Sequence, residues 1–191
     1  LQSEFEGRLF LEKRNKKSGL GTAYVHGFRW ALRHKYDFIF EMDADFSHNP
    51  NDLEKLYNAC HLGDADLAIG SRYVTGVNVV NWPLSRVLMS YFASVYVRMI
   101  TGMKIHDATA GFVCYKRKVL EEINLDKIKF VGYAFQIEMK YRTYCKSFQI
   151  VEVPIIFTDR TKGQSKMSNS IIIEAVFGVI ALRLKKLFNT L

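Results

Sequence analysis

Short apolar runs alternate along this chain with longer segments whose apolar residues recur at helical spacing. The runs at 37–43 and 65–72 have continuously apolar centres, as strands buried on both faces of a parallel sheet do. Residues 19–34 have the helical spacing, and a second helix is expected from Pro50, with Asn49 as its cap. This alternation predicts an α/β fold with a mostly parallel sheet flanked by helices.

The rest of the chain contains further helix and strand patterns. A helix over Leu84–Thr101 has a broad apolar stripe. A strand over 148–157 contains Pro154, which indicates a bulge or an edge of the sheet. The other expected elements are a short strand at 8–14, a strand within 109–117, a helix over 133–145 and a final helix at about 170–188. The chain has 191 residues and no linker, so we expect a single domain.

Charge and cysteine content limit the classes of function. The formal net charge of +8 favours an acidic partner, such as nucleic acid, an anionic membrane surface or a phosphate-rich substrate. The sequence has no RNP-like aromatic strand, helix-turn-helix pattern or Cys/His finger, so we do not expect nucleic acid as the partner. Three cysteines without a CxxC pair predict a reducing compartment and neither a disulfide framework nor a zinc site. We expect Cys60, Cys114 and Cys145 to be small buried side chains.

Two acidic residues, Asp43 and Asp45, follow the apolar residues 38–40. Open parallel sheets bind ligands beyond the carboxyl ends of their strands, and residues two apart in an extended chain point the same way. Neighbouring carboxylates repel one another unless a cation or a shared proton lies between them. The pair suits Mg²⁺ or Mn²⁺, which takes one or two protein carboxylates together with substrate phosphates. Two unrelated acids at a solvated strand end would have the same spacing.

Basic residues occur at three separate places outside the helix interiors. Arg72 ends the second apolar run, Arg86 lies at the start of the long helix, and the loop 159–167 contains Arg160 and Lys166. Arginine holds phosphate through two parallel hydrogen bonds, and lysine adds a point charge. A solvated basic loop is the usual explanation for one such segment. Three positions in one α/β fold favour a phosphate-binding site.

Six motifs follow one another between about Gly19 and Met167. They are MDADFSHNP at 42–50, GSRY at 70–73, WPLSRVLMS at 82–90, DATAGFVCYKR at 107–117, YAFQIEM at 133–139 and DRTKGQSKM at 159–167. In type and order they resemble the motifs of polyprenol-phosphate mannosyltransferases, the dolichol-phosphate-mannose-synthase branch of family 2 glycosyltransferases. A single motif would be weak, whereas six in order make the resemblance specific.

The resemblance implies a Rossmann-like GT-A fold and an inverting transfer of mannose from GDP-mannose to a polyprenyl phosphate, such as dolichyl or undecaprenyl phosphate. It implies that Asp43 and Asp45 bind Mg²⁺ or Mn²⁺, with Asp45 as the direct ligand. Ser47 falls where some relatives place a further polar group on the metal side. The catalytic residues implied are Asp45, Arg72 and Arg160. The implied acceptor-phosphate residues are Arg72, Arg86, Ser90, Arg160 and Lys166, and Asp107 and Glu138 lie in the vicinity of the sugar or acceptor.

The sequence is also compatible with two other functions. A polyprenyl-phosphate glucosyltransferase using a UDP-sugar would share the motifs. A catalytically silent module would bind anionic membranes through two helices, at about 83–101 and about 170–188, which either lie at a membrane interface or pack in the core. The resemblance implies a peripheral enzyme on the cytoplasmic face of a membrane, or one held there by a membrane-anchoring partner.

One departure from the family concerns its first two strands. These contain a PTYNE-like and a DDGSxDGT-like segment, which together hold the base and ribose of the donor. Neither segment occurs in residues 1–191. We therefore expect a partial catalytic domain that lacks early strands of the sheet and binds GDP poorly on its own.

Overall fold

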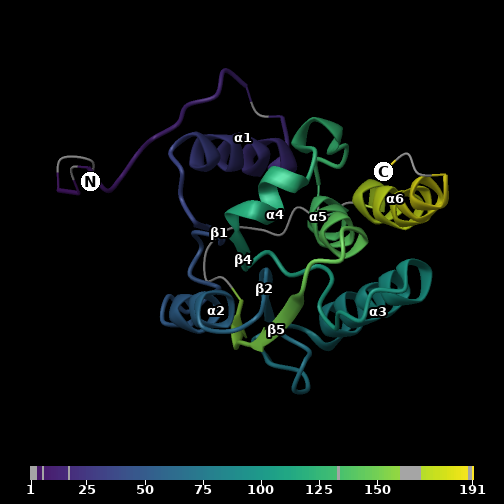
Figure 1. The fold of residues 1–191 in the computed structure, drawn as a ribbon. Helices are drawn as coiled ribbons and strands as arrows, with labels where there is room; N and C mark the ends of the chain where they lie inside the picture. The colour runs from purple at the N-terminus through teal and green to yellow at the C-terminus, as the bar shows by residue number, and fades with distance from the viewer. Residues whose placement is uncertain (1–3, 6, 17, 133, 160–168, 189–190) are drawn as a thin grey trace.

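A mixed four-stranded sheet forms the centre of the protein (Figure 1). The computed structural model describes residues 4, 5, 7–16, 18–132, 134–159, 169–188 and 191. The strand order is β1–β4–β2–β5, where β1 is Phe38–Glu41, β4 is Val113–Lys116, β2 is Leu67–Ser71 and β5 is Ile150–Pro154. β4 is antiparallel to β1 and β2, and β5 is parallel to β2, so three of these four strands run in one direction. The predicted α/β class and mostly parallel strand direction are confirmed, but the reversed strand β4 between β1 and β2 was not predicted.

Helices cover both faces of this sheet. They are α1 (Leu20–Arg33), α2 (Asp52–His61), α3 (Leu84–Thr101), α4 (Arg117–Glu122), a 3-10 turn (Leu125–Lys127), α5 (Ala134–Cys145) and α6 (Asn169–Leu187). A second, two-stranded sheet pairs β3 (Val79–Val80) with β6 (Phe157–Thr158). Along β2, Leu67 and Ile69 join the larger core, which also contains residues of α1, α3, α5 and α6, whereas Ala68 joins the smaller core beside α2. The period of two that places alternate strand residues on opposite faces therefore builds two cores.

Most predicted elements are present, with three corrections. The strand expected at 8–14 is absent, because no strand of the described residues forms a ladder with that segment, and its side chains are exposed. The second helix begins at Asp52 rather than Pro50, although the Asn49 side chain still accepts a hydrogen bond from the Asn51 amide at 3.0 Å. The strand expected over 148–157 is divided in two, because Pro154 ends β5 at an edge of the four-stranded sheet and β6 pairs with β3 in the other sheet. The long helix has the predicted bounds.

The cysteines largely follow the prediction of buried small side chains. Cys60 and Cys114 are fully buried in the smaller core, and the Cys60 thiol lies 3.8 Å from the Cys114 carbonyl oxygen. Cys145 at the end of α5 is only partly buried, so that prediction was too strong for it. All three are free thiols.

Helices α3 and α6 pack side by side at one side of the molecule (Figure 1), and the Tyr96 hydroxyl of α3 donates to the Val176 carbonyl of α6 at 2.9 Å. α3 buries only Ser94, Val97 and Thr101. Its large apolar side chains on the opposite face are exposed, among them Leu84, Leu88, Phe92 and Met99. Core packing therefore accounts for little of the apolar stripe. In the described part of the chain, no helix is both long and apolar enough to cross a bilayer.

Gly21 lets the start of α1 approach the chain before α5. Its amide donates to the Val131 carbonyl at 3.0 Å. A Cβ atom at this position would lie 2.8 Å from the Phe135 ring and would also collide with the Phe130 carbonyl. A Cβ atom at Gly27, in the same helix, would meet nothing within 4 Å. The two glycines thus differ in packing while sharing one helix.

We expect Gly21→Ala to lower the free energy of unfolding by about 1–3 kcal/mol, because an overpacked side chain forces backbone shifts. Gly27→Ala should raise it by up to about 1 kcal/mol, because alanine has the higher helix propensity. Urea denaturation of both variants measures the difference. Equal effects at the two positions would show that the close approach of Gly21 to Phe130 and Phe135 does not constrain α1.

Candidate active site

A cavity of about 440 Å³ opens beyond the carboxyl ends of β1 and β2. Its polar end contains Asp43 and Asp45 from the segment after β1, Arg72 from the end of β2, and Arg86 and Ser90 from α3. Its other wall is apolar and comes from α3 and α6, with Met89, Phe92, Tyr96, Val97, Val176 and Val179. The cavity therefore combines a charged end with an apolar end.

The structure brings five of the predicted site residues together in this cavity: Asp43, Asp45, Arg72, Arg86 and Ser90. Asp107 is not among the lining residues, but its carboxylate accepts hydrogen bonds from the Arg72 guanidinium. Glu138 is not among the lining residues. Its buried carboxylate accepts from Arg142 and from the amides of Lys129 and Phe130, so its contacts hold the chain before α5. The predicted residues Arg160 and Lys166 lie outside the described part of the chain.

The two acids sit on a tight turn that follows β1. The Asp45 carboxylate accepts from the Ser47 amide at 3.1 Å and from the Ser47 hydroxyl at 2.5 Å. Phe46 between them has φ 63°, a left-handed conformation that is unusual for a bulky residue. The Tyr24 hydroxyl lies 3.4 Å from Asp43. Burial, followed by the charges of Glu41 and Asp43, raises the pKa of Tyr24, so its hydroxyl keeps the proton that it donates.

The donor set of this turn fits a hard divalent cation. Among the described residues, no group of three or more His, Cys, Asp or Glu side chains could hold a metal ion. The Asp43 and Asp45 carboxylates are nevertheless oxygen donors on one wall of an open cavity. Mg²⁺ is bound through one or two carboxylates, with substrate phosphates completing its coordination, whereas structural zinc takes four protein ligands. The pair thus fits Mg²⁺ or Mn²⁺ better than a closed structural metal site.

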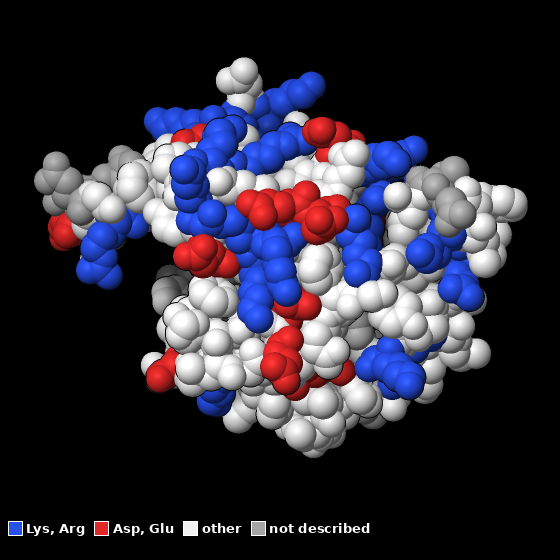
Figure 2. Space-filling view, viewed as in Figure 1, with Lys and Arg blue, Asp and Glu red and all other residues white. Residues whose placement is uncertain are grey.

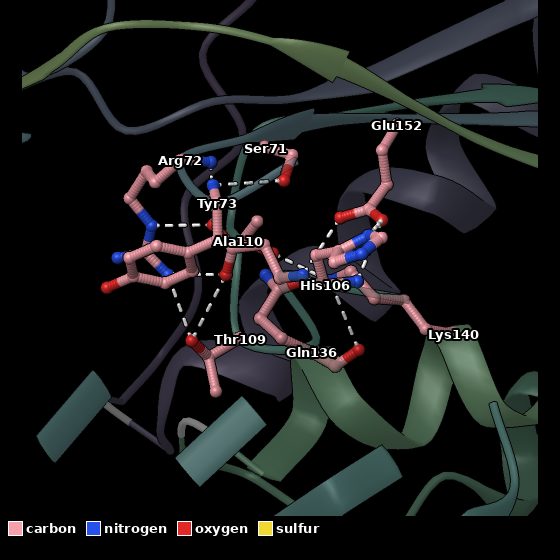
Figure 3. A network of polar contacts seen from close by, with 10 residues as sticks. Ser71, Arg72, Tyr73, His106, Thr109, Ala110, Gln136, Lys140 and Glu152 are labelled. Atoms are coloured by element: carbon pink, nitrogen blue, oxygen red, sulfur yellow. Dashed lines mark hydrogen bonds and ion pairs between the residues drawn. The ribbon is translucent and has the colours of Figure 1, made fainter. Parts of the chain in front are cut away.

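Arg72 is held by a buried network (Figure 3). Its Nε and Nη2 atoms donate to the Asp107 carboxylate at 2.7 and 2.6 Å, its backbone amide donates to the same carboxylate at 3.0 Å, and Nη2 also reaches the Thr109 hydroxyl at 2.9 Å. Burial alone would raise the pKa of Asp107, but the charge and hydrogen bonds of Arg72 outweigh it and lower that pKa. Both groups are therefore charged at neutral pH.

Trp82 joins the two arginines of the cavity. The Arg86 guanidinium carbon lies 4.1 Å from the centre of the indole ring, and that of Arg72 lies 5.3 Å from it. Arg86 also donates to the Asp159 carboxylate at 2.9 Å, and this pair is about a quarter exposed. Stacking on an indole favours a guanidinium cation in a fixed orientation. The cationic end is thus built from two arginines on one ring.

Residue-level reasoning missed several lining side chains, namely His48, Trp82, Thr109, Gln136 and Asp159. Each lies inside one of the six sequence motifs. Membership of a motif was the signal that could have identified them. The predicted site residues were chosen mainly among acidic and basic side chains. His48 is buried between the rings of Phe112 and Phe157, whose centres lie 4.9 and 5.1 Å away. Burial, followed by the charge of Arg72, lowers the pKa of His48 to about 4.

The pKa of His48 predicts a loss of stability in acid. Between pH 6.5 and about 4 the unfolded chain binds a proton at His48 and the folded chain does not, so the free energy of unfolding falls as the pH falls through this window. The contribution is at most about 1.4 kcal/mol per pH unit. His48→Gln should flatten the pH dependence measured by urea denaturation with a chelator present. His61→Gln, at an exposed ring, controls for the loss of an imidazole; an unchanged slope in His48→Gln would contradict the assignment.

The comparison with known families now defines the class of protein. Residues 1–124 match the model of glycosyl transferase family 2, and the chain belongs to this family. It is 50% identical over 172 residues to the polyprenol monophosphomannose synthase of Mycolicibacterium smegmatis, covering 90% of this chain and 64% of that protein. It is 48% identical over 166 residues to the undecaprenyl-phosphate mannosyltransferase of Micrococcus luteus, covering 87% of this chain and 68% of that protein. The chain thus spans about two thirds of these curated relatives.

Solved structures confirm the GT-A fold. A crystal structure of glucosyl-3-phosphoglycerate synthase from Mycobacterium tuberculosis with Mn²⁺, UDP and phosphoglyceric acid has a TM-score of 0.59 and 15% identity, covering 89% of this chain and 54% of that one. Another, with Mg²⁺ and UDP, has a TM-score of 0.59 and 14% identity, covering 91% and 56%. At this identity the likeness shows the fold alone.

Proposed function

We propose that this chain is part of a metal-dependent, inverting mannosyltransferase that moves mannose from GDP-mannose to a polyprenyl phosphate. The observation that carries the proposal is that the same cavity contains two carboxylates and two arginines at one end and apolar side chains of α3 and α6 at the other. A polyprenyl phosphate has the same division into an anionic head and an apolar tail. The names of the two curated relatives support this acceptor and sugar.

Asp43 and Asp45 are the residues proposed to hold Mg²⁺ or Mn²⁺. When bound, the ion would act as a Lewis acid that stabilises the departing nucleoside diphosphate. The turn at Phe46 and the two hydrogen bonds from Ser47 orient the Asp45 carboxylate before any ligand arrives. Such preorganisation lowers the cost of orienting the site during the reaction.

Arg72, Arg86 and Ser90 are proposed to hold the acceptor phosphate at the cationic end. The second pKa of a phosphate monoester is about 6, so at neutral pH an anionic oxygen is available and needs no strong general base. That oxygen attacks the anomeric carbon, the bond to the diphosphate breaks, and the anomeric centre inverts. The arginines position the oxygen beside an anionic donor and screen the repulsion. Arg160 and Lys166 are proposed to add positive charge, and Asp107 is proposed to hold Arg72.

The exposed apolar face of α3 and α6 is proposed to lie on the cytoplasmic face of a membrane, with the prenyl chain against the apolar wall of the cavity. Leu84, Leu88, Phe92 and Met99 lie on one face of α3, opposite its buried residues. Figure 2 shows a few basic side chains within the mostly uncharged area of α3 and α6. Basic side chains beside an apolar helix face add attraction to anionic lipids.

The test is a transfer assay on the full-length protein with radiolabelled GDP-mannose and a short prenyl monophosphate. We expect transfer to require Mg²⁺ or Mn²⁺, and Asp45→Asn to lower kcat/KM by about 100-fold or more, because a group that stabilises developing charge is lost. Asp64→Asn, at an exposed acid after α2, is the matched control.

Three results would contradict this proposal in different ways. Transfer that survives both a chelator and Asp45→Asn would refute the metal site. Faster transfer from a UDP-sugar in a panel of donors would replace GDP-mannose. Vesicle binding by a protein that transfers no sugar from any donor would favour the catalytically silent module.

Membrane association is tested separately by vesicle co-sedimentation. Met99 of α3 and Leu62 after α2 are 78% and 76% exposed, and Met99 does not line the cavity. Met99→Gln should weaken binding to anionic vesicles several-fold, because an apolar side chain no longer leaves water, whereas Leu62→Gln should not. Equal losses would show that this face of α3 does not meet the membrane. Transfer to a detergent-dispersed acceptor should survive in both variants.

A further inference from the structure

The Glu152 carboxylate on β5 accepts hydrogen bonds from the backbone at 106–107, a segment distant in the sequence (Figure 3). One of its oxygens accepts from the Asp107 amide at 2.8 Å. The other accepts from the His106 amide at 2.7 Å and lies 2.8 Å from the His106 ring nitrogen Nδ1. The side chain of Glu152 is only 7% exposed. A buried carboxylate that serves two consecutive amides fixes both position and direction of the backbone there.

The same segment carries the groups that hold Arg72. Asp107 is fully buried and binds the guanidinium through both carboxylate oxygens, and Thr109 accepts a further hydrogen bond from it. Opposite Glu152 in the sheet register is Ile69 of β2, the strand that leads into Arg72. Strand β5 thus positions Arg72 in two ways. It pairs with β2, the strand before Arg72, and its Glu152 holds the backbone of Asp107, which binds the guanidinium.

Lys140 of α5 holds the far end of this segment. Its ammonium group donates to the Ala110 carbonyl at 2.6 Å and lies 3.3 Å from both the Gln136 carbonyl and the Gln136 side-chain oxygen. Lys140 is fully buried. The segment 106–110 is therefore tied at its start to the sheet and at its end to a helix.

We propose that Glu152 is a positioning residue for Arg72, acting through the backbone at 106–107 and the Asp107 carboxylate. The proposal rests on the proposed function, in which Arg72 contacts the acceptor phosphate. Glu152 does not line the cavity, so its effect on transfer passes through Arg72. A long arginine side chain loses much conformational entropy when it is ordered, and a site that orders it beforehand binds its ligand more tightly.

Glu152→Gln is the variant that tests this role. The amide keeps the size of the side chain but has only one accepting oxygen, so one of the two backbone amides loses its partner. In steady-state kinetics on the full-length protein, KM for a short prenyl monophosphate should rise about 10-fold or more, as expected for a lost hydrogen bond to a charged group. KM for GDP-mannose should change by less than about 2-fold, because the carboxylate pair is untouched.

Asp66→Asn is the matched control. Asp66 lies just before β2, at the opposite end of the strand from Arg72, and its carboxylate accepts from the Gln149 amide at 3.0 Å and pairs with Lys118 at 2.6 Å. The Asp66→Asn variant loses a buried charged acceptor beside the same sheet, at a position that does not line the cavity. KM for the acceptor should stay unchanged in this variant. An equal rise in both variants would reduce the effect of Glu152 to general loss of stability and overturn the proposal.

A double-mutant cycle with Arg72→Lys tests the route. In the Arg72→Lys background, Glu152→Gln should produce little further rise in KM, because the group that it positions has already been replaced. Fully additive effects would overturn the proposal. If Glu152→Gln does not fold, Lys140→Met removes the other tie and should raise KM for the acceptor selectively; no selective rise would then overturn it.

Hydrogen exchange supplies a measurement independent of transfer. The His106 and Asp107 amides should exchange faster in Glu152→Gln than in the wild type, and at the wild-type rate in Asp66→Asn. Unchanged exchange would show that Glu152 does not hold the segment. If the wild type transfers no sugar but the variants show these exchange rates, the proposed function is refuted, whereas the role of Glu152 in holding the backbone at 106–107 is supported.

Discussion

The buried ion pair between Arg72 and Asp107 is the interaction on which the cavity depends. Removing two charges from water costs several kcal/mol per ion, and good geometry must offset that cost. Three hydrogen bonds join Arg72 to Asp107, and the rings of Tyr73, Trp82 and Phe157 surround the guanidinium. Loss of one partner would leave the other charge buried, at about 3–5 kcal/mol. The cationic end of the cavity is therefore preformed, and it is coupled to the stability of the domain.

Local chemistry explains why much of this arrangement could be predicted from the sequence. The apolar run before Asp43 specified a buried strand, and the carboxyl end of such a strand is where an α/β sheet binds ligands. Pro83 and Gly102 mark the ends of α3, because proline suits a helix start and Gly102 adopts φ 76° at its end. The placement of Asp45, Arg72 and Arg86 in one cavity followed from motif order rather than from the physics of any single segment.

The remaining features depend on contacts between distant residues. The reversed direction of β4 is set by its pairing with both β1 and β2, which no local pattern records. The segment 8–14 was expected to form a strand, but no strand of the described residues pairs with it, and its side chains contact those of α1, as Glu12 does with His26. No local pattern marks Glu152, because its two amide partners lie at 106 and 107, far away in the sequence. Glu138 lies in one of the motifs, but its buried carboxylate accepts from the Lys129 amide and from Arg142, which both lie outside that motif.

The apolar wall of the cavity comes from the same two helices that expose an apolar face to the outside. Under the proposed function, the acceptor would keep its tail among other lipids while its head enters the charged end. Encounter would then take place in a plane, and the rate would depend on acceptor molecules per unit area of membrane rather than per volume of solution. Diluting the acceptor with inert lipid would slow the enzyme even though the amounts of both in the tube stay the same.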